Sequence, residues 1–326
     1  MSWHDFHGWR RVPEHVAMGA GPEFDLVRRM IARWGDLATN IGSDAGQVEI
    51  PAGEQVVAST DSAIEGVHFK RHWFAPRDIG RRATVAALSD LAAAAVTPRA
   101  VLLALGLPEE LRDVVEEIAE GVGTAVREAG AHARIIGGDL TRSPHLVLGL
   151  TVIGSGPQPL GRAGARPGDA IYVTGVLGGP QQAIEAWERG ELPTPWARDR
   201  FVAPRARVAE ALWLRERGAV AAIDVSDGLS SELAHLAAAS GCEFRVDVAR
   251  VPRPAGISWR DAVRGGEEYE LVVVVRGELD VDAFARAFGV PLTRIGVVRA
   301  SEVGRVIATE DGVRVDLPGG HDHFSR

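Results

Sequence analysis

The sequence predicts an α/β (α+β) fold in two mixed α/β domains. In both halves of the chain, short apolar runs typical of strands alternate with longer segments of helical spacing. The length of 326 residues fits about two domains of roughly 150 residues each. A segment of small residues, Gly154-Ser155-Gly156-Pro157, is the best candidate for a linker. We therefore expect an extension at 1–22, an N-terminal domain at 23–155 and a C-terminal domain at 156–326.

The composition excludes several classes of protein. The net charge is -8 and no basic run occurs, which argues against nucleic acid as a partner. Cys242 is the only cysteine, so we expect neither an intrachain disulfide nor a cysteine zinc site. There is no signal-peptide core and no apolar stretch of about 20 residues. We therefore expect no membrane partner and a cytoplasmic location.

Lysine is almost absent from the chain. Lys70 is the only one, so the G-x-x-x-x-G-K-[ST] phosphate loop is missing. Schiff-base chemistry would require Lys70 itself. If the protein binds a nucleotide, then arginines, backbone N–H groups and metal ions must neutralise the phosphates.

The first elements follow an irregular segment. Residues 1–22 are rich in Trp, His and Gly, and we expect them to form a flexible or loosely docked extension. Apolar residues at helical spacing predict a helix at 23–31. Strand signals follow at 47–50 and 55–59, separated by the turn Pro51-Ala52-Gly53.

Helices and strands then alternate to the middle of the chain. An alanine-rich face predicts that the helix at 78–95 packs tightly on a sheet. The apolar run 100–107 indicates a buried strand, and the amphipathic segment 109–129 predicts a helix that ends at Gly130. The remaining strands of this half are expected at 133–136 and 145–153. They flank a turn at Gly137-Gly138-Asp139.

The C-terminal half repeats the alternation after a glycine-rich loop at 161–169. The strongest strand signal is 271–275, a run of Leu and Val. Ser226 or Asp227 is placed to cap the helix at 229–239. The expected strands are 170–174, 219–225, 243–248, 271–275, 292–299, 306–309 and 313–316. The expected helices are 181–189, 204–217, 229–239 and 280–288.

Acidic residues beside Gly, Ser or Thr recur at the expected ends of strands and starts of helices. Ser59-Thr60-Asp61 follows a strand end, and Asp90 lies in an apolar helix, where an unpaired charge is costly. Mg²⁺ usually sits between one or two carboxylates and substrate phosphates. The pattern therefore favours a carboxylate cage for Mg²⁺ with phosphates bound to it. Its candidate members are Asp44, Asp61, Asp90, Asp139, Asp224 and Asp227.

Each of these acids also has a purely structural interpretation. Asp44 and Asp139 suit turns, and Asp227 suits a helix cap. Asp90 suits a solvated helix face. Taken one at a time, these interpretations are the more common ones, and the joint occurrence of the acids favours the metal site.

Other polar residues have two interpretations as well. Gly137-Gly138-Asp139 either brings backbone N–H groups to a phosphate or forms a plain tight turn. Arg162, in a loop flanked by glycine, contacts a phosphate or is a surface charge. His68 contacts a ligand or is a satisfied polar side chain. The pair Glu267-Glu268 and the nearby Glu270 bind a cationic substrate or line a solvated strand end.

The order of these motifs resembles that of thiamine-monophosphate kinase, in the superfamily that includes aminoimidazole ribonucleotide synthetase. The resemblance runs from about Glu23 to Phe324, nearly the whole chain. The motifs at His68, at Glu267 and in the tail favour this kinase among its relatives. In chain order the motifs are Ser59-Thr60-Asp61 with His68-Phe69, Leu88-Ser89-Asp90-Leu91-Ala92, Gly137-Gly138-Asp139, Arg162 through Gly168-Asp169, Asp224-Val225-Ser226-Asp227-Gly228-Leu229, Gly265-Gly266-Glu267-Glu268-Tyr269-Glu270-Leu271 and Asp322-His323-Phe324.

The resemblance implies direct transfer of the γ-phosphate of ATP to thiamine monophosphate, giving thiamine diphosphate. It also implies several Mg²⁺ ions and a homodimer whose N-terminal domains pair. By the match, the metal ligands are Asp44, Ser59 through its backbone, Thr60, Asp61, Asp90, Asp139, Asp224 and Asp227. The implied ATP contacts are Gly138, Asp139, Arg162 and Ser226, and the implied substrate contacts are His68, Glu267 and His321.

Five positions depart from the family pattern. Ser43 replaces an aspartate, and we expect weakened metal binding at most. Leu140 replaces a threonine near the nucleotide, and His321 replaces an aromatic residue that would stack on the substrate ring. Ala95 stands for a glycine and Glu268 for an aspartate. These departures leave two alternatives open, namely another ATP-using enzyme of the superfamily with a different substrate, and a non-catalytic nucleotide-binding relative.

Overall fold

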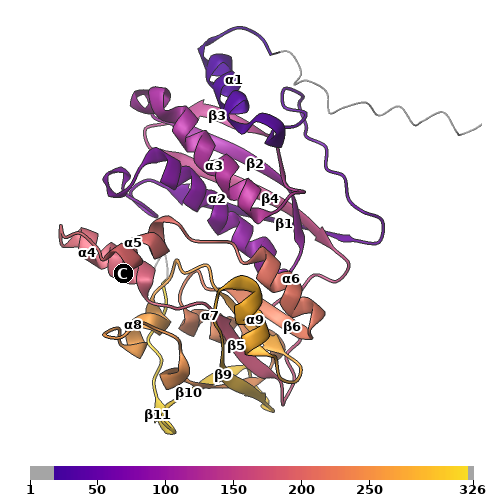
Figure 1. Cartoon of the computed structure of the whole chain (residues 1–326), viewed down its shortest axis with the longest axis vertical. Helices are drawn as coiled ribbons and strands as arrows, with labels where there is room; N and C mark the ends of the chain where they lie inside the picture. The colour runs from indigo at the N-terminus through magenta and orange to yellow at the C-terminus, as the bar shows by residue number, and fades with distance from the viewer. Residues whose placement is uncertain (1–17, 322–326) are drawn as a thin grey trace, which may run out of the picture.

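The computed structural model describes residues 18–321, which form two sheets with helices packed on both (Figure 1). The predicted α/β (α+β) class is therefore confirmed. Residues 1–17 of the expected extension, and the Asp322-His323-Phe324 tail, lie outside the described part. Among the described residues, no helix is both long and apolar enough to cross a membrane.

Helices and strands alternate along most of the chain, and the longest stretch of the described residues without either is 38–54. The helices are α1 (Pro22–Trp34), α2 (Pro76–Ala93), α3 (Val115–Ala129), α4 (Gly179–Glu188), α5 (Pro195–Val202), α6 (Val208–Glu216), α7 (Leu229–Ser240), α8 (Trp259–Arg264) and α9 (Val281–Phe288). The strands are β1 (Gln55–Ile64), β2 (Thr97–Leu107), β3 (Arg134–Arg142), β4 (Val147–Gly156), β5 (Ala170–Thr174), β6 (Ala219–Asp224), β7 (Glu243–Asp247), β8 (Leu271–Val275), β9 (Leu292–Arg299), β10 (Arg305–Glu310) and β11 (Val313–Val315).

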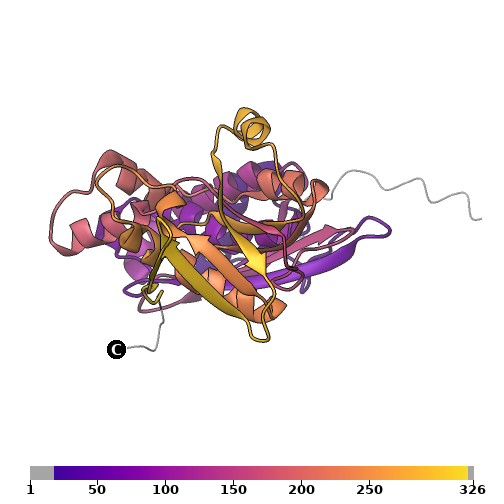
Figure 2. The same cartoon turned by 90° about the horizontal axis from the view of Figure 1, so that it is seen from below.

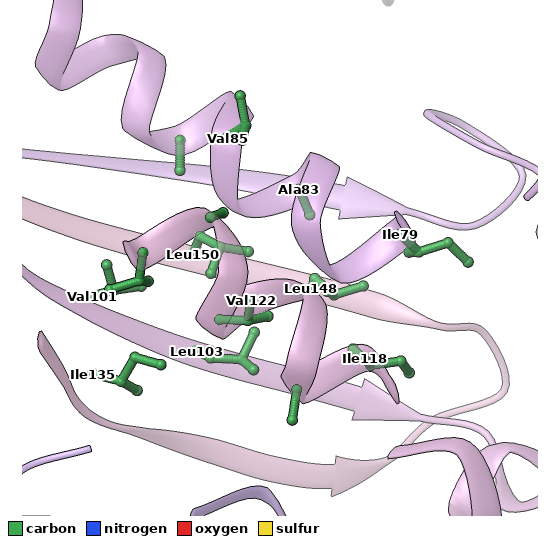
Figure 3. Close-up of a cluster of buried hydrophobic side chains, with 14 of the residues drawn as sticks. Ile79, Ala83, Val85, Val101, Leu103, Ile118, Val122, Ile135, Leu148 and Leu150 are labelled. Atoms are coloured by element: carbon green, nitrogen blue, oxygen red, sulfur yellow. The ribbon is translucent and has the colours of Figure 1, made fainter. Parts of the chain in front are cut away.

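The first sheet has the strand order β1-β4-β2-β3, with β2 and β3 parallel and the other neighbours antiparallel. Helices α2 and α3 cover one of its faces, where Leu103, Leu148 and Leu150 point between the helices and the strands (Figure 3). The alternating burial of β4 shows that the opposite face lacks such a cover. This face becomes important for the assembly proposed below.

Helices α2 and α3 cross at two glycines, which let their backbones approach closely. A Cβ atom added at Gly121 would lie 1.9 Å from the carbonyl oxygen of Arg77, and one added at Gly80 would lie 2.2 Å from that of Ile118. Backbone atoms cannot move aside as the end of a side chain can. The spacing of the helix pair therefore depends on these two positions.

We expect Gly121→Ala to lower the free energy of unfolding by about 1–3 kcal/mol, since the methyl group forces the helices apart. Urea denaturation of the variant and the wild type would measure the change. Gly130→Ala is a poor control because Gly130 has φ 137, whereas Gly161→Ala adds a methyl group to open space. Equal stability of the Gly121 and Gly161 variants would contradict the close crossing.

The second sheet has the order β11-β10-β7-β9-β5-β8-β6 and is covered on both faces. Helices α7 and α8 contribute to the core on one face, and α6 and α9 contribute to the core on the other. All five residues of β8 are buried, which agrees with its uninterrupted apolar sequence. Figure 2 shows this half, in orange and yellow, in front of the N-terminal half.

Helices α4 and α5 belong to the second half of the sequence but pack on the core of the first. Phe201 of α5 is fully buried in that core. The ring of Trp187 stacks on Trp73 at a centroid distance of 5.0 Å, 13° from parallel. The two halves of the chain therefore share an aromatic contact, and the division of the chain into domains at residue 155 stays a prediction.

One strand, one turn and one linker expected in the N-terminal half differ in the structure. Residues 47–50 form no strand, because β1 is an edge strand that pairs only with β4. Gly137-Gly138-Asp139 lies inside β3 and not in a turn, since β3 pairs with β2 through Arg142. Residues 154–156 end β4 and are not a linker, because they pair with the start of β1.

The C-terminal half contains two short helices that we did not expect. Each follows a residue that commonly caps helices, Thr194 before α5 and Ser258 before α8, and this was the available sequence signal. In the structure Thr194 accepts a hydrogen bond from the N–H of Ala197, and Ser258 accepts one from the N–H of Asp261. The helix expected at 204–217 begins only at Val208. The residue that caps α7 is Gly228, without a side-chain bond, so the cap predicted at Ser226 or Asp227 is wrong.

Candidate active site

A pocket of about 580 Å³ lies where β1 and α2 face α4, the loop after β6 and the loop before β8. It collects most of the residues that the sequence singled out. Nine of them line it: Thr60, Asp61, His68, Asp90, Asp224, Ser226, Asp227, Glu267 and His321. These positions are up to 261 residues apart in the sequence (321 minus 60), so the fold assembles the pocket from both halves.

The motif Ser59-Thr60-Asp61 lies within β1, whereas the sequence placed it after a strand end. The burial of β1 alternates, so Ser59 and Asp61 are more buried than Thr60 between them. The hydroxyl of Ser59 donates a hydrogen bond to Oδ2 of Asp90 on α2. The edge strand therefore holds Asp61 beside Asp90.

Burial and like charge act together on the acids at this end of the pocket. Burial raises the pKa of Asp224 to about 7, and the charge of Asp90 adds to the effect. Burial also raises the pKa of Asp90, with a smaller contribution from Asp61, while Ser59 and Arg162 oppose the shift. Carboxylates in such a position are stabilised by a cation that binds between them.

Glu232 belongs to the same acidic group and was not predicted. It is only 2% exposed, and its Oε1 accepts a hydrogen bond of 3.0 Å from the N–H of Asp227. Burial raises its pKa to about 7. Arg162 lowers the pKa of both Asp90 and Glu232, so its guanidinium lies close to this group without lining the pocket. The signal for Glu232 was its place in the first turn of α7, after Ser226-Asp227.

The acids fit Mg²⁺ when phosphate oxygens complete the coordination. Among residues 18–321, no three His, Cys, Asp or Glu side chains lie close enough together to hold one ion. Mg²⁺ is usually bound by one or two carboxylates together with phosphates and water. The neighbours Asp61 and Asp90, and likewise Asp90 and Asp224, therefore suit an ion that arrives with a nucleotide.

Gly138 and Asp139 do not line the pocket, because they lie at the far edge of the first sheet. Asp61, Leu150, Leu103 and Gly138 occupy one row across its four strands. Three strand spacings separate the ends of this row, about 14 Å. Within one chain, Gly138 and Asp139 are therefore too far from Asp61 to share an ion with it.

Asp44 is exposed and belongs to the same far edge. Its loop packs on β3, since a Cβ atom added at Gly46 would lie 2.7 Å from the carbonyl oxygen of Ile136. The predicted ligands thus form two groups in one chain. One group lines the pocket, and the other lies on and beside β3.

The motif Gly265-Gly266-Glu267 presents one carboxylate to the pocket. Glu267 has φ 65, a left-handed backbone conformation that is rare for a residue with a side chain. Gly266 has no room for a side chain, because an added Cβ would lie 2.4 Å from the carbonyl oxygen of Ser226. The Glu267 N–H donates to that same oxygen at 2.7 Å. This loop therefore holds Glu267 in a strained conformation at the pocket wall.

Glu268 and Glu270 do not face the pocket, so they neither bind a cationic substrate nor line a solvated strand end. Both are buried, and both pair with Arg200, which lies 3.0 Å from Glu270. Arg200 pairs with Glu268 at 3.2 Å, and Arg207 binds Glu270 through two nitrogens at 2.6 and 2.8 Å. These pairs anchor the segment behind Glu267.

His68 and His321 lie on the pocket wall at different places. The Nδ1 atom of His68 accepts a hydrogen bond of 3.1 Å from the N–H of Ile64, so a neutral ring carries its proton on Nε2. The backbone N–H of His321 donates to the carbonyl oxygen of Asp227 at 2.8 Å. This bond places the last described residue beside the acidic group.

Comparison with known proteins assigns the family. Residues 42–155 match AIR synthase related protein, N-terminal domain, and residues 166–311 match AIR synthase related protein, C-terminal domain. Thiamine-monophosphate kinase of Salmonella typhimurium is 35% identical over 326 residues, spanning 93% of this chain and 98% of that protein. The chain belongs to the thiamine-monophosphate kinase family. The resemblance inferred from the order of the motifs is thus confirmed.

Solved structures agree with this family. The crystal structure of thiamine-monophosphate kinase from Stenotrophomonas maltophilia has a TM-score of 0.78 and 32% identity, covering 93% of this chain and 99% of that one. A structure of AaThiL complexed with AMPPCP and TMP has a TM-score of 0.73 and 27% identity, covering 92% and 96%. The similarity in both cases spans nearly the full length of this family member.

Proposed function

We propose that this chain transfers the γ-phosphate of ATP to thiamine monophosphate, forming thiamine diphosphate and ADP. The observation that carries the proposal is the single pocket that joins Asp61, Asp90 and Asp224 to His68 and Glu267. Relatives of nearly equal length bear the name thiamine-monophosphate kinase. The acids suit a metal-bound triphosphate, and the histidine and glutamate suit the organic acceptor.

The chain would act by alignment and by charge neutralisation. Phosphoryl transfer passes through a loose transition state that needs little covalent help from the protein. Asp61 with Asp90, and Asp90 with Asp224, would each contribute to holding a Mg²⁺ ion, and these ions would supply positive charge to the transferring phosphate. Arg162 lies near the acids and would contact the nucleotide. The absence of a lysine phosphate loop agrees with this division of labour.

The second group of ligands is the main argument for a homodimer. Asp44, Gly138 and Asp139 lie on the far edge of a sheet whose second face carries exposed apolar residues, such as Val56 at 59% exposure. An uncovered sheet face is a common site of association. We propose that two N-terminal sheets pair through it, and that Asp44 and Asp139 of one chain approach the pocket of the other.

The proposed reaction also sets the remaining partners and the location. Its substrates are ATP and thiamine monophosphate, with Mg²⁺ as the metal, and ATP is a cytoplasmic nucleotide. The net charge of -8 gives no attraction to nucleic acid. We therefore propose a cytoplasmic enzyme whose only ligands are small molecules.

Incubation of the purified protein with ATP, Mg²⁺ and thiamine monophosphate tests the proposal. Chromatography should detect thiamine diphosphate, formed at a rate on the order of 0.1 s⁻¹ or more. Thiamine in place of thiamine monophosphate is the control acceptor and should give no diphosphate. Absence of product would favour another enzyme of the superfamily if ATP is still consumed, and a non-catalytic relative if ATP is bound but not consumed.

We expect His68→Ala to raise the KM for thiamine monophosphate about tenfold while the KM for ATP changes less than about twofold. The reason is that the variant removes a polar side chain from the pocket wall but none of the acids that suit the metal-bound triphosphate. Initial rates at varied concentrations of each substrate would measure both constants. A larger rise in the KM for ATP would place His68 in the nucleotide site instead.

A further inference from the structure

Arg82 connects the first half of the chain to the glutamate loop in the second half. It lies on α2 and is only 5% exposed, although it lines the pocket wall. Its Nη1 donates a hydrogen bond of 2.7 Å to the carbonyl oxygen of Phe201. Its guanidinium carbon lies 3.7 Å from the centroid of the Phe201 ring and 5.5 Å from that of Tyr269. A planar cation held between two rings and a carbonyl has little freedom to move.

The other end of this guanidinium binds Glu267. Nη2 of Arg82 donates to Oε2 of Glu267, in an ion pair whose arginine is buried and whose glutamate side chain is 25% exposed. The hydroxyl of Tyr269 donates to the same Oε2 atom at 2.7 Å. Burial and the charge of Glu267 raise the pKa of Tyr269 well above its usual value, so this hydroxyl keeps its proton and remains a donor.

The two donors leave the carboxylate asymmetric. Both bonds go to Oε2, and among residues 18–321 no hydrogen bond goes to Oε1. Tyr269, like Glu267, has a left-handed backbone, with φ 52. Two nearby residues therefore have strained backbones, and between the two donors Oε2 is held in place while Oε1 stays available in a residue that lines the pocket.

We propose that Arg82 is a positioning residue for the acceptor substrate, acting through Glu267. The ion pair cancels the charge of the carboxylate, so Glu267 recognises the substrate as a hydrogen-bond acceptor and not as a counter-ion. Oε1 then takes one N–H donor, as an amino group on a heteroaromatic ring would supply. This inference rests on the proposed function, because it concerns the same pocket and the same organic acceptor.

Steady-state kinetics of five variants, among them Glu267→Gln alone and combined with Arg82→Met, test the role of Arg82. We expect Arg82→Met to raise the KM for thiamine monophosphate about tenfold or more, with less than about a twofold change in the KM for ATP. Arg82→Lys keeps the charge and should recover part of the loss. In the double variant, Arg82→Met should add less than about twofold to the effect of Glu267→Gln, since its partner is already altered. The fifth variant, Tyr269→Phe, removes the second donor to Oε2 and should raise the KM for thiamine monophosphate.

The neighbouring arginine supplies a matched control. Arg81 is also on α2, but it does not line the pocket. Its Nη2 donates a hydrogen bond of 2.7 Å to Oε2 of Glu128. Arg81→Met should change neither KM by more than about twofold. The wild-type protein, measured in the same assay, separates the proposed function from the role of Arg82. An inactive wild type overturns the proposed function itself.

Several results would overturn the role of Arg82 while the wild type remains active. One is a parallel rise of both KM values in Arg82→Met, which indicates general damage to the fold. Another is a double variant in which the KM for thiamine monophosphate rises by the product of the two single-variant factors, because Arg82 and Glu267 would then act independently. If Arg82→Met does not fold, an unchanged KM for thiamine monophosphate in Tyr269→Phe would overturn it as well.

Discussion

Asp61→Asn is expected to lower kcat by about 100-fold to 1000-fold and to leave the protein folded. Asp61 is a member of the acidic group in the pocket, and its charge contributes to raising the pKa of Asp90. Its removal takes away a metal ligand but no part of the core, since β1 keeps its backbone bonds to β4. Turnover at saturating ATP, Mg²⁺ and thiamine monophosphate would measure the loss, and thermal unfolding would verify the fold.

The control for this variant is Asp36→Asn, which removes an exposed carboxylate remote from the pocket. It should retain full activity. Unchanged turnover in Asp61→Asn would show that Asp61 is not a metal ligand. If Asp61→Asn loses its activity because it is largely unfolded at the assay temperature, Asp61 is instead a structural residue.

Arg207→Met is expected to lower the free energy of unfolding by about 3–5 kcal/mol, the largest effect on stability that we predict. Arg207 and Glu270 are both buried, and two hydrogen bonds join them. Burial opposes the ionisation of Glu270, yet the charges of Arg207 and Arg200 hold its pKa below the usual value. Without Arg207, a buried carboxylate remains with only part of its neutralising charge.

Urea denaturation would measure this loss, with Arg28→Met as the control. Arg28 pairs with Asp25 on the surface, so the control should lose less than about 1 kcal/mol. A loss of the same size in both variants would mean that the Glu270 pair adds nothing beyond a surface contact. It would also remove the reason for regarding this segment as the anchor of Glu267.

Local patterns predicted the strands and long helices well where packing agrees with local preference. The run Leu271–Val275 is a central strand, as its uninterrupted apolar residues suggested. Gly137-Gly138-Asp139 was misjudged because glycine and aspartate favour turns locally. Its pairing with β2 overrides that preference, and Gly138 is needed there because an added Cβ would lie 1.9 Å from the carbonyl oxygen of Leu103.

The candidate site could be predicted where a residue belongs to a recognisable motif, as Asp224 and His68 do. Glu232 is marked only by its place in the first turn of α7, and Arg82 belongs to an ordinary-looking helix in which nothing nearby in the sequence marks it. Arg82 acquires its role from Glu267, which lies 185 residues further along the chain. Such partners become visible only when the fold brings them together.

The departures from the family pattern can now be placed in the structure. Ala95 has φ 50, so the glycine expected there would suit a left-handed position. Glu268 is buried against Arg200 and Gly178, away from the pocket wall. His321 lines the pocket, where it stands in for the expected aromatic residue. Of these three, only His321 is placed to affect the choice of substrate directly.

The most direct test of the central claim follows the γ-phosphate of ATP. The purified protein would be mixed with ATP labelled at the γ-phosphorus, Mg²⁺ and thiamine monophosphate, and the labelled products separated by chromatography. Direct transfer predicts that the label appears in thiamine diphosphate in the same amount as ADP, and that little is released without the acceptor. Label found only as inorganic phosphate, with no thiamine diphosphate, would contradict the proposed function.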